Sequence, residues 1–199
     1  MIYFIRHGST DWNEHINALG QKDPKFQGRA NIPLNQKGIQ QALVMAEMLK
    51  GKEFDRVICS PLIRARQTCE LIYHGKTPIE TDDRLIERDF GKKTGKTQMQ
   101  IDDFQQFCNR YTIMDDKTAE SIIDVEKRVF SLLDELKENP NQEVLIVSHG
   151  GVGCVVMSYF KGIPENGDYL SFLMPHGKPL ILDFKDLEKR QCISSDRLK

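Results

Sequence analysis

Short apolar runs alternate along this chain with longer amphipathic segments, and this alternation limits the possible folds more than any other feature. Strands are predicted at residues 2–5, 57–59, 79–80, 144–147 and 180–184. Helices, identified by apolar residues three and four positions apart, are predicted at 36–50, 60–73, 119–138 and 150–160, with a weaker pattern at 98–110. Asn35 is a suitable N-cap for the first helix, and Ser60-Pro61 is a typical start for the second. The alternation indicates an α/β fold with a mostly parallel central sheet.

Length and charge exclude several classes of protein. The 199 residues suit one domain over 1–199 whose core needs no disulfide or metal. Lys and Arg number 28 and Asp and Glu 29, so the net charge of −1 gives no sign of a nucleic-acid or membrane partner. The apolar runs are too short to span a bilayer, the N-terminus lacks a signal-peptide pattern, and the five cysteines form no C-x-x-C pair. A reduced, cytoplasmic protein with a peripheral polar tail after Asp186 is therefore expected.

Three polar clusters each follow a predicted strand directly. They are Arg6-His7-Gly8-Ser9-Thr10, Ser60-Pro61-Leu62-Ile63-Arg64 and Ser148-His149-Gly150-Gly151. Because the carboxyl ends of parallel strands meet at one edge of a sheet, and ligands bind there, the clusters are expected to converge. Two guanidinium groups and the N-termini of the following helices suit a phosphate group. An imidazole beside a bound phosphoryl group can act as a nucleophile, and Glu87 is a candidate proton donor.

Simpler interpretations of the same residues remain open. Taken alone, Arg64 on a helix fits a solvated surface residue, and Gly150-Gly151 fits a tight turn between a strand and a helix. His15, His74 and His176 are interpreted as structural. His7 and His149 stand in no H-x-H or H-E-x-x-H pattern, so a metal site is not favoured.

An ordered set of motifs resembles the histidine phosphatase superfamily, also called the phosphoglycerate mutase-like family. The set covers most of residues 1–160 in family order. It consists of Arg6-His7-Gly8-Ser9-Thr10-Asp11-Trp12-Asn13, Gln27-Gly28 with Ile32-Pro33-Leu34, Ser60-Pro61-Leu62-Ile63-Arg64-Ala65-Arg66-Gln67-Thr68, Leu85-Ile86-Glu87-Arg88-Asp89-Phe90-Gly91, Glu120-Ser121 with Val125 and Arg128, and Val147-Ser148-His149-Gly150-Gly151.

The resemblance implies a fold, a reaction and a set of site residues. The fold would be a three-layer α/β/α sandwich. His7 would attack phosphorus and become a phosphohistidine, and Glu87 would donate the proton and then activate water. Arg6, Arg64 and His149 would hold the phosphoryl oxygens. Asn13, Thr10, Gln27, Gly28 and Gly150 would line the phosphate pocket. The resemblance implies a metal-independent phosphatase of histidine acid phosphatase type, with no cofactor and a small phosphorylated metabolite as substrate.

Departures from the family pattern concern the substrate. Residues 14–26 form an apparent insertion, and residues 87–118 an expected short lid. Phe90 and Gln98 stand where the family's mutases usually carry tyrosine and lysine, which favours a phosphatase. A phosphoglycerate mutase-type phosphotransferase and a non-catalytic regulatory module remain the alternatives.

Two further features of the lid each allow two interpretations. Phe104, Phe107, Tyr111 and Met114 form either helix core or an apolar wall for the leaving group. Arg88, Lys92, Lys93 and Lys96 form either a solvated surface or a site for a second anionic group of the substrate.

Overall fold

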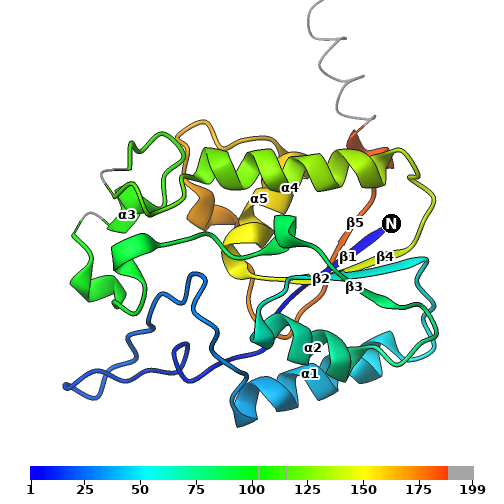
Figure 1. The fold of residues 1–199 in the computed structure, drawn as a ribbon, viewed down its shortest axis with the longest axis horizontal. Helices are drawn as coiled ribbons and strands as arrows, with labels where there is room; N and C mark the ends of the chain where they lie inside the picture. The colour runs from blue at the N-terminus through cyan, green and yellow to red at the C-terminus, as the bar shows by residue number, and fades with distance from the viewer. Residues whose placement is uncertain (103, 115, 188–199) are drawn as a thin grey trace, which may run out of the picture.

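The fold is built around one five-stranded sheet (Figure 1). The computed structural model describes residues 1–102, 104–114 and 116–187. The strands are β1 (Ile2–Arg6), β2 (Arg56–Cys59), β3 (Ile79–Thr81), β4 (Val144–Ser148) and β5 (Leu180–Leu182), in the order β3-β2-β4-β1-β5. Only β5 runs antiparallel to its neighbour, so the predicted mostly parallel sheet is confirmed.

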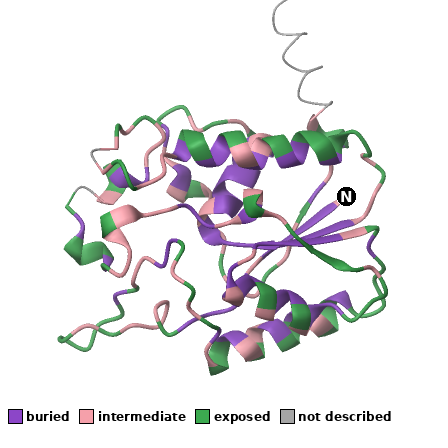
Figure 2. Cartoon of the chain, viewed as in Figure 1, coloured by how far each residue is buried: buried purple, intermediate pink, exposed green. Residues whose placement is uncertain are grey.

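Helices cover both faces of the sheet and give the expected three layers. Helices α1 (Gln36–Leu49) and α2 (Ile63–Ile72) lie on one face, and α4 (Ile122–Lys137) and α5 (Gly150–Lys161) lie on the other (Figure 1). Neighbouring residues of β1 point to opposite faces: Phe4 joins the core under α4 and α5, and Ile5 joins the core under α1 and α2. The purple centre of Figure 2 is this doubly covered sheet.

The sequence predicts the first residue of α1 correctly, whereas α2 and α4 begin a few residues later than predicted. The Asn35 side chain accepts a hydrogen bond from the Gly38 amide at 2.9 Å, as expected of an N-cap. The second helix begins at Ile63 rather than at Ser60, and the Ser60 hydroxyl lies 2.7 Å from Nε2 of His149. The long fourth helix begins at Ile122 rather than at 119, since Ser121 is its cap and bonds the Asp124 amide.

The lid is not the single helix predicted at 98–110. Over its described residues it consists of short pieces, namely 3-10 turns at Gly91–Lys93 and Gln98–Gln100 and a four-residue helix α3 at Phe104–Phe107. Further 3-10 turns lie at Asp83–Leu85 and Tyr169–Phe172. The lid and residues 14–33 lie at the end of the sheet toward which β1 runs (Figure 1).

Two other sequence expectations concern cysteines and membrane spans. The four described cysteines are free and buried. Across the described ranges, every helix is too short or too polar to cross a bilayer. Cys192 and most of the polar tail predicted after Asp186 lie outside the described residues.

Candidate active site

The carboxyl ends of β1, β2 and β4 bring the three polar clusters together, as the sequence predicts. Arg6 at the end of β1 pairs in register with Ser148 at the end of β4. The rings of His7 and His149 lie 5.2 Å apart, centre to centre. A cavity of about 360 Å³ opens there, lined by Arg6, His7, Arg64 and Glu87 among others. Residues from three distant parts of the sequence therefore share one pocket.

His7 is held with one ring nitrogen free of a proton. Its Nδ1 lies 2.7 Å from the carbonyl oxygen of Gly8, which can only accept, so Nδ1 carries the hydrogen. Its Nε2 is 3.2 Å from the Nε of Arg64, a donor, so Nε2 presents a lone pair. Burial, followed by the charges of Arg64 and Arg6, holds the pKa of His7 well below 6.5. A neutral imidazole with an available lone pair is the form in which histidine is a nucleophile.

Arg64 is a buried cation, not the solvated surface residue that its helical position alone would suggest. It is 1% exposed, and its two terminal nitrogens donate to the carbonyl oxygens of Ala30 at 2.7 Å and Gly28 at 2.8 Å. Burial lowers the pKa of Arg64 to about 10, so the group stays charged at neutral pH. The carbonyls orient the guanidinium group without neutralising it.

Buried polar atoms without partners gather at the same place. Arg6 donates from Nη1 to the Met174 carbonyl at 2.7 Å, while its buried Nε has no partner among the described residues. His149 is 2.7 Å from the Ser60 hydroxyl through Nε2, and its Nδ1 has no partner within the same described part of the chain. Since buried polar groups are normally paired, these atoms indicate a site for a polar ligand.

Glu87 is fixed by backbone amides beside the N-terminus of α5. Its Oε1 accepts from the Arg88 amide at 2.9 Å, and its Oε2 accepts from the Gly151 amide at 3.2 Å. A Cβ atom at position 151 would lie 2.6 Å from Oε1 of Glu87. A side chain at position 151 would therefore displace the Glu87 carboxylate from its present position, so Gly151 allows this close approach in addition to forming the turn.

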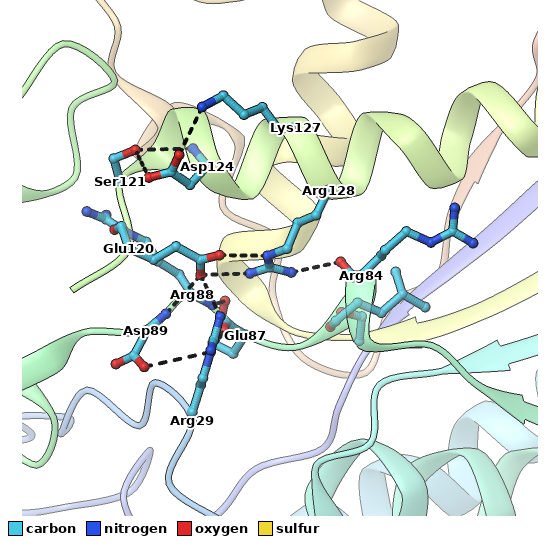
Figure 3. Close-up of polar contacts among 12 residues, drawn as sticks. Arg29, Arg84, Glu87, Arg88, Asp89, Glu120, Ser121, Asp124, Lys127 and Arg128 are labelled. Atoms are coloured by element: carbon cyan, nitrogen blue, oxygen red, sulfur yellow. Dashed lines mark hydrogen bonds and ion pairs between the residues drawn. The ribbon is translucent and has the colours of Figure 1, made fainter. Parts of the chain in front are cut away.

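A charged network holds the loop that carries Glu87 (Figure 3). Glu120 binds Arg128 through two contacts of 2.8 and 3.0 Å, and it also accepts from the amide of Asp89 at 3.2 Å. Arg128 donates in turn to the Arg84 carbonyl at 2.7 Å. The loop is thus anchored on both sides of Glu87, which favours a fixed position for its carboxylate.

The remaining predicted site residues differ in their placement. Asn13, Gln27, Gly28 and Gly150 line the cavity. Thr10 is fully buried and is not a lining residue; its hydroxyl and amide both lie 3.1 Å from the Oδ1 of Asn13. His149 is also absent from the cavity lining, and its ring lies edge to face with that of His7.

His176 is the residue that the sequence interpretation missed. It lines the cavity, its ring lies 5.4 Å from that of His7, and its Nδ1 is 2.6 Å from the His7 carbonyl oxygen. His15 and His74 stay outside the cavity. A single histidine in an irregular segment has no spacing pattern, so no sequence signal distinguished His176 from those two.

The buried histidines predict a loss of stability in mild acid. Burial lowers the pKa of His176 to about 4 and holds that of His149, like that of His7, well below 6.5. Below pH 6.5 the unfolded chain therefore binds protons that the folded chain does not. The free energy of unfolding should fall by about 1.4 kcal/mol per pH unit for each imidazole. Urea unfolding between pH about 7.5 and about 5, without phosphate, measures this slope.

Between pH about 7.5 and about 5, the free energy of unfolding depends on the histidines and not on the carboxylates. The Arg56 and Arg84 hydrogen bonds that lower the pKa of Glu135 affect stability only below its ordinary value of 4.5. The variant His176→Asn keeps a donor for the His7 carbonyl and should reduce the slope by about one third. An unchanged free energy of unfolding across the window would contradict the prediction.

A metal ion would need several ligating side chains in one place. Among the described residues, no cluster of three or more His, Cys, Asp or Glu side chains is placed to hold one. The positive charge of the site comes from its arginines.

Comparison with known proteins agrees with this geometry. The model of the histidine phosphatase superfamily (branch 1) matches residues 2–190. Agropine synthesis reductase of Rhizobium rhizogenes is 37% identical over 178 residues, which are 86% of this chain and 39% of that protein. This chain therefore spans about two fifths of the length of that relative.

Two further relatives are matched over most of their length. The uncharacterized phosphatase PhoE of Bacillus subtilis is 32% identical over 81% of this chain and 77% of its own. The crystal structure of a putative alpha-ribazole-5'-P phosphatase from Escherichia coli superposes with a TM-score of 0.73 and 27% identity, covering 89% of this chain and 87% of that one. The chain belongs to the histidine phosphatase superfamily.

Proposed function

We propose that this protein hydrolyses phosphate monoesters of small metabolites through a phosphohistidine intermediate, without a metal ion. One observation carries the proposal. Arg6 and the buried Arg64 line one cavity beside a neutral histidine, and among the described residues neither arginine forms an ion pair with a carboxylate. Concentrated positive charge of this kind binds a phosphate dianion far better than a neutral ligand.

The first chemical step transfers the phosphoryl group to His7. The lone pair of Nε2 forms a bond to phosphorus while the ester P–O bond breaks, and the electron pair of that bond passes to the leaving oxygen. Glu87 gives this oxygen a proton, so an alcohol departs. Arg6, Arg64 and His149 stabilise the charge on the non-bridging oxygens in the transition state.

The second step returns the enzyme to its starting form. Water attacks phosphorus, the N–P bond breaks, and its electron pair returns to Nε2 of His7. Glu87, now a carboxylate, takes the proton from the attacking water. The net reaction consumes one water molecule and yields an alcohol and inorganic phosphate. Asn13 and the N-terminus of α5 complete the phosphate pocket.

The mutase alternative receives less support from the cavity. Gln98 lines the cavity at the position where the resemblance places a lysine in mutases. Without that cation, the acid formed by phosphoryl transfer to His7 is held less firmly. It leaves the cavity more readily, and water takes its place. This favours hydrolysis over return of the phosphoryl group to a retained intermediate.

The proposal predicts turnover that does not depend on a metal ion. p-Nitrophenyl phosphate and a panel of metabolite monoesters would be assayed with and without an excess of EDTA. Rates should agree within about twofold, because the two arginines supply the charge that a metal would otherwise supply. Loss of activity with EDTA that added metal restores would overturn metal independence. Interconversion of phosphoglycerates without hydrolysis of any monoester would instead identify a mutase.

A further inference from the structure

The cavity has an apolar half that the phosphoryl chemistry does not use. Beside the arginines and histidines, its lining includes aromatic and aliphatic side chains from the lid, from α4 and from the segment that precedes β5. Among these apolar lining residues are Phe26, Phe90, Phe104, Ile122, Val125 and Leu173. This half of the cavity must receive whatever remains of the substrate beyond its phosphate group.

Three phenylalanines form one wall of the apolar half. The Phe26 ring lies 5.3 Å from the Phe90 ring, edge to face, and 5.3 Å from the Phe104 ring. Each comes from a different irregular segment: residues 14–33, the loop that carries Glu87, and α3. The Phe26 backbone is fixed by two hydrogen bonds of 2.8 Å, one to the Lys96 carbonyl and one from the Gly95 amide. The backbone hydrogen bonds therefore fix Phe26, the central ring of this wall.

Another part of the lining is aliphatic, and two of its residues belong to the core of the fold. Ile122 and Val125 lie in the first turns of α4, line the cavity, and are 6% and 1% exposed. Leu173, which follows the 3-10 turn at Tyr169–Phe172, is 49% exposed and lies at the open side. Both parts of the lining favour an apolar group, because both lose water when such a group binds.

The charges near this half leave little to hold a second anionic group. Arg88 lines the cavity, but all three of its guanidinium nitrogens donate to residues outside the lining, namely the carbonyls of Glu120 at 2.7 Å and Phe107 at 2.9 Å and the sulfur of Met114 at 3.4 Å. Arg64, by contrast, donates to His7 and Gly28, which line the cavity. Lys22 forms an ion pair with Glu14 at 3.2 Å and is exposed. Lys25, which is half-buried in the lining, remains as a cation that a second anionic group could contact.

The basic residues of the lid face elsewhere. Lys92, Lys93 and Lys96 line a separate hollow together with Asp102 and Asp116. Of the lid aromatics, Phe104 lines the cavity, whereas Phe107 is buried and Tyr111 is exposed. These three lysines therefore do not line the cavity, and their role toward a second anionic group of the substrate stays a prediction.

We infer that the substrate is a phosphate monoester of an uncharged, mainly apolar alcohol with about the bulk of one aromatic ring. The inference rests on the proposed function and narrows it. A cavity of about 360 Å³ lies at the small end of ligand pockets, so it suits a phosphate group and one ring. Hydrolysis by water releases inorganic phosphate at the cationic end and the neutral alcohol at the apolar end.

The test compares alkyl phosphates whose leaving oxygens are chemically similar. The probes are 2-phenylethyl phosphate, glycerol 1-phosphate and 3-phosphoglycerate, so differences in kcat/KM report recognition rather than reactivity. The aromatic ester should exceed the two others by about 30-fold, the ratio that burial of one ring supplies. The variant Phe104→Ala should lower kcat/KM for the aromatic ester about tenfold and leave glycerol 1-phosphate within about threefold.

Matched variants keep the test decisive. Tyr111→Ala removes an exposed aromatic ring of the same lid and should change no ratio. Leu173→Ala truncates a half-exposed lining side chain, so it should fold even if Phe104→Ala does not, and it should lower the same ratio. Lys25→Gln measures whether Lys25 recognises a second negative charge on the substrate. It should leave the ratios of kcat/KM among the three esters unchanged.

The outcomes separate this inference from the proposed function. A preference for 3-phosphoglycerate that Lys25→Gln abolishes would overturn the apolar substrate class. An equal loss on all three esters in Phe104→Ala and Leu173→Ala would overturn it as well. Hydrolysis of p-nitrophenyl phosphate would persist in both cases, whereas failure to hydrolyse any monoester would remove the proposed function itself.

Discussion

Replacement of His7 by alanine is expected to lower kcat for every phosphate monoester by at least about 10⁴-fold, since it removes the atom that attacks phosphorus. Binding should survive, because Arg6 and Arg64 remain to hold the phosphate group. Inorganic phosphate should therefore still inhibit, or protect against urea, at concentrations within about tenfold of those for the parent protein. The measurements are steady-state kinetics and ligand-dependent unfolding.

Three histidine variants distinguish the nucleophile from its neighbours. In His149→Ala the phosphoenzyme should still form, but slowly, because the ring stabilises the transition state without forming a bond to phosphorus. His74→Ala alters an exposed histidine outside the cavity and should behave like the parent protein. Phosphohistidine is trapped by rapid quenching in alkali and located by mass spectrometry.

The location of the trapped phosphate decides the assignment. Phosphate on His7 alone would support the mechanism. Phosphate on His149 or His176, or a phosphoenzyme that persists in His7→Ala, would refute it. The lone pair on Nε2 of His7 and the contact of His149 with Ser60 are the structural reasons for expecting the first result.

Most of the candidate site could be predicted from the sequence, because its residues directly follow regular strands. The strand ends at Arg6 and Ser148 could be found from apolar runs alone, and parallel pairing then brings them to one edge. Burial of Arg64 could not be found in this way. It depends on two carbonyl groups of residues 28 and 30, and such contacts leave no periodic signal in the sequence.

The lid was predicted poorly for a related reason. Its described residues form one four-residue helix and short 3-10 turns, too short for a helical period to register. Their positions are set by tertiary contacts, such as the Phe26 amide on the Lys96 carbonyl and the Phe26 ring on Phe104. The same contacts place apolar side chains in the cavity lining, so the part of the cavity proposed to select substrates was the least visible in the sequence.

The net charge of −1 conceals the strongest electrostatic feature of the molecule. Arg6 and Arg64 are held by carbonyl oxygens, which orient a cation but leave its charge in place. Glu120 and Arg128, by contrast, neutralise each other while they position the loop of Glu87. Paired charges thus position the loop, whereas unpaired charges remain for the ligand.

Replacement of Glu87 by glutamine should separate substrates by their leaving groups. An alkyl alcohol leaves as a poor anion and needs a proton, whereas p-nitrophenolate leaves readily without one. The variant should therefore lose about 10²- to 10⁴-fold in kcat/KM on alkyl phosphates and less than about tenfold on p-nitrophenyl phosphate.

The hydrogen bonds of Glu87 make this comparison between substrates necessary. Both carboxylate oxygens accept from backbone amides, and an amide side chain can accept from only one of them. The resulting displacement affects all substrates alike, so only the difference between alkyl and aryl esters measures proton donation. Glu14→Gln removes another carboxylate from the cavity lining and should produce no such difference. Equal losses on both ester classes in Glu87→Gln would show that Glu87 positions the substrate and donates no proton, and the acid would then have to be another group or solvent.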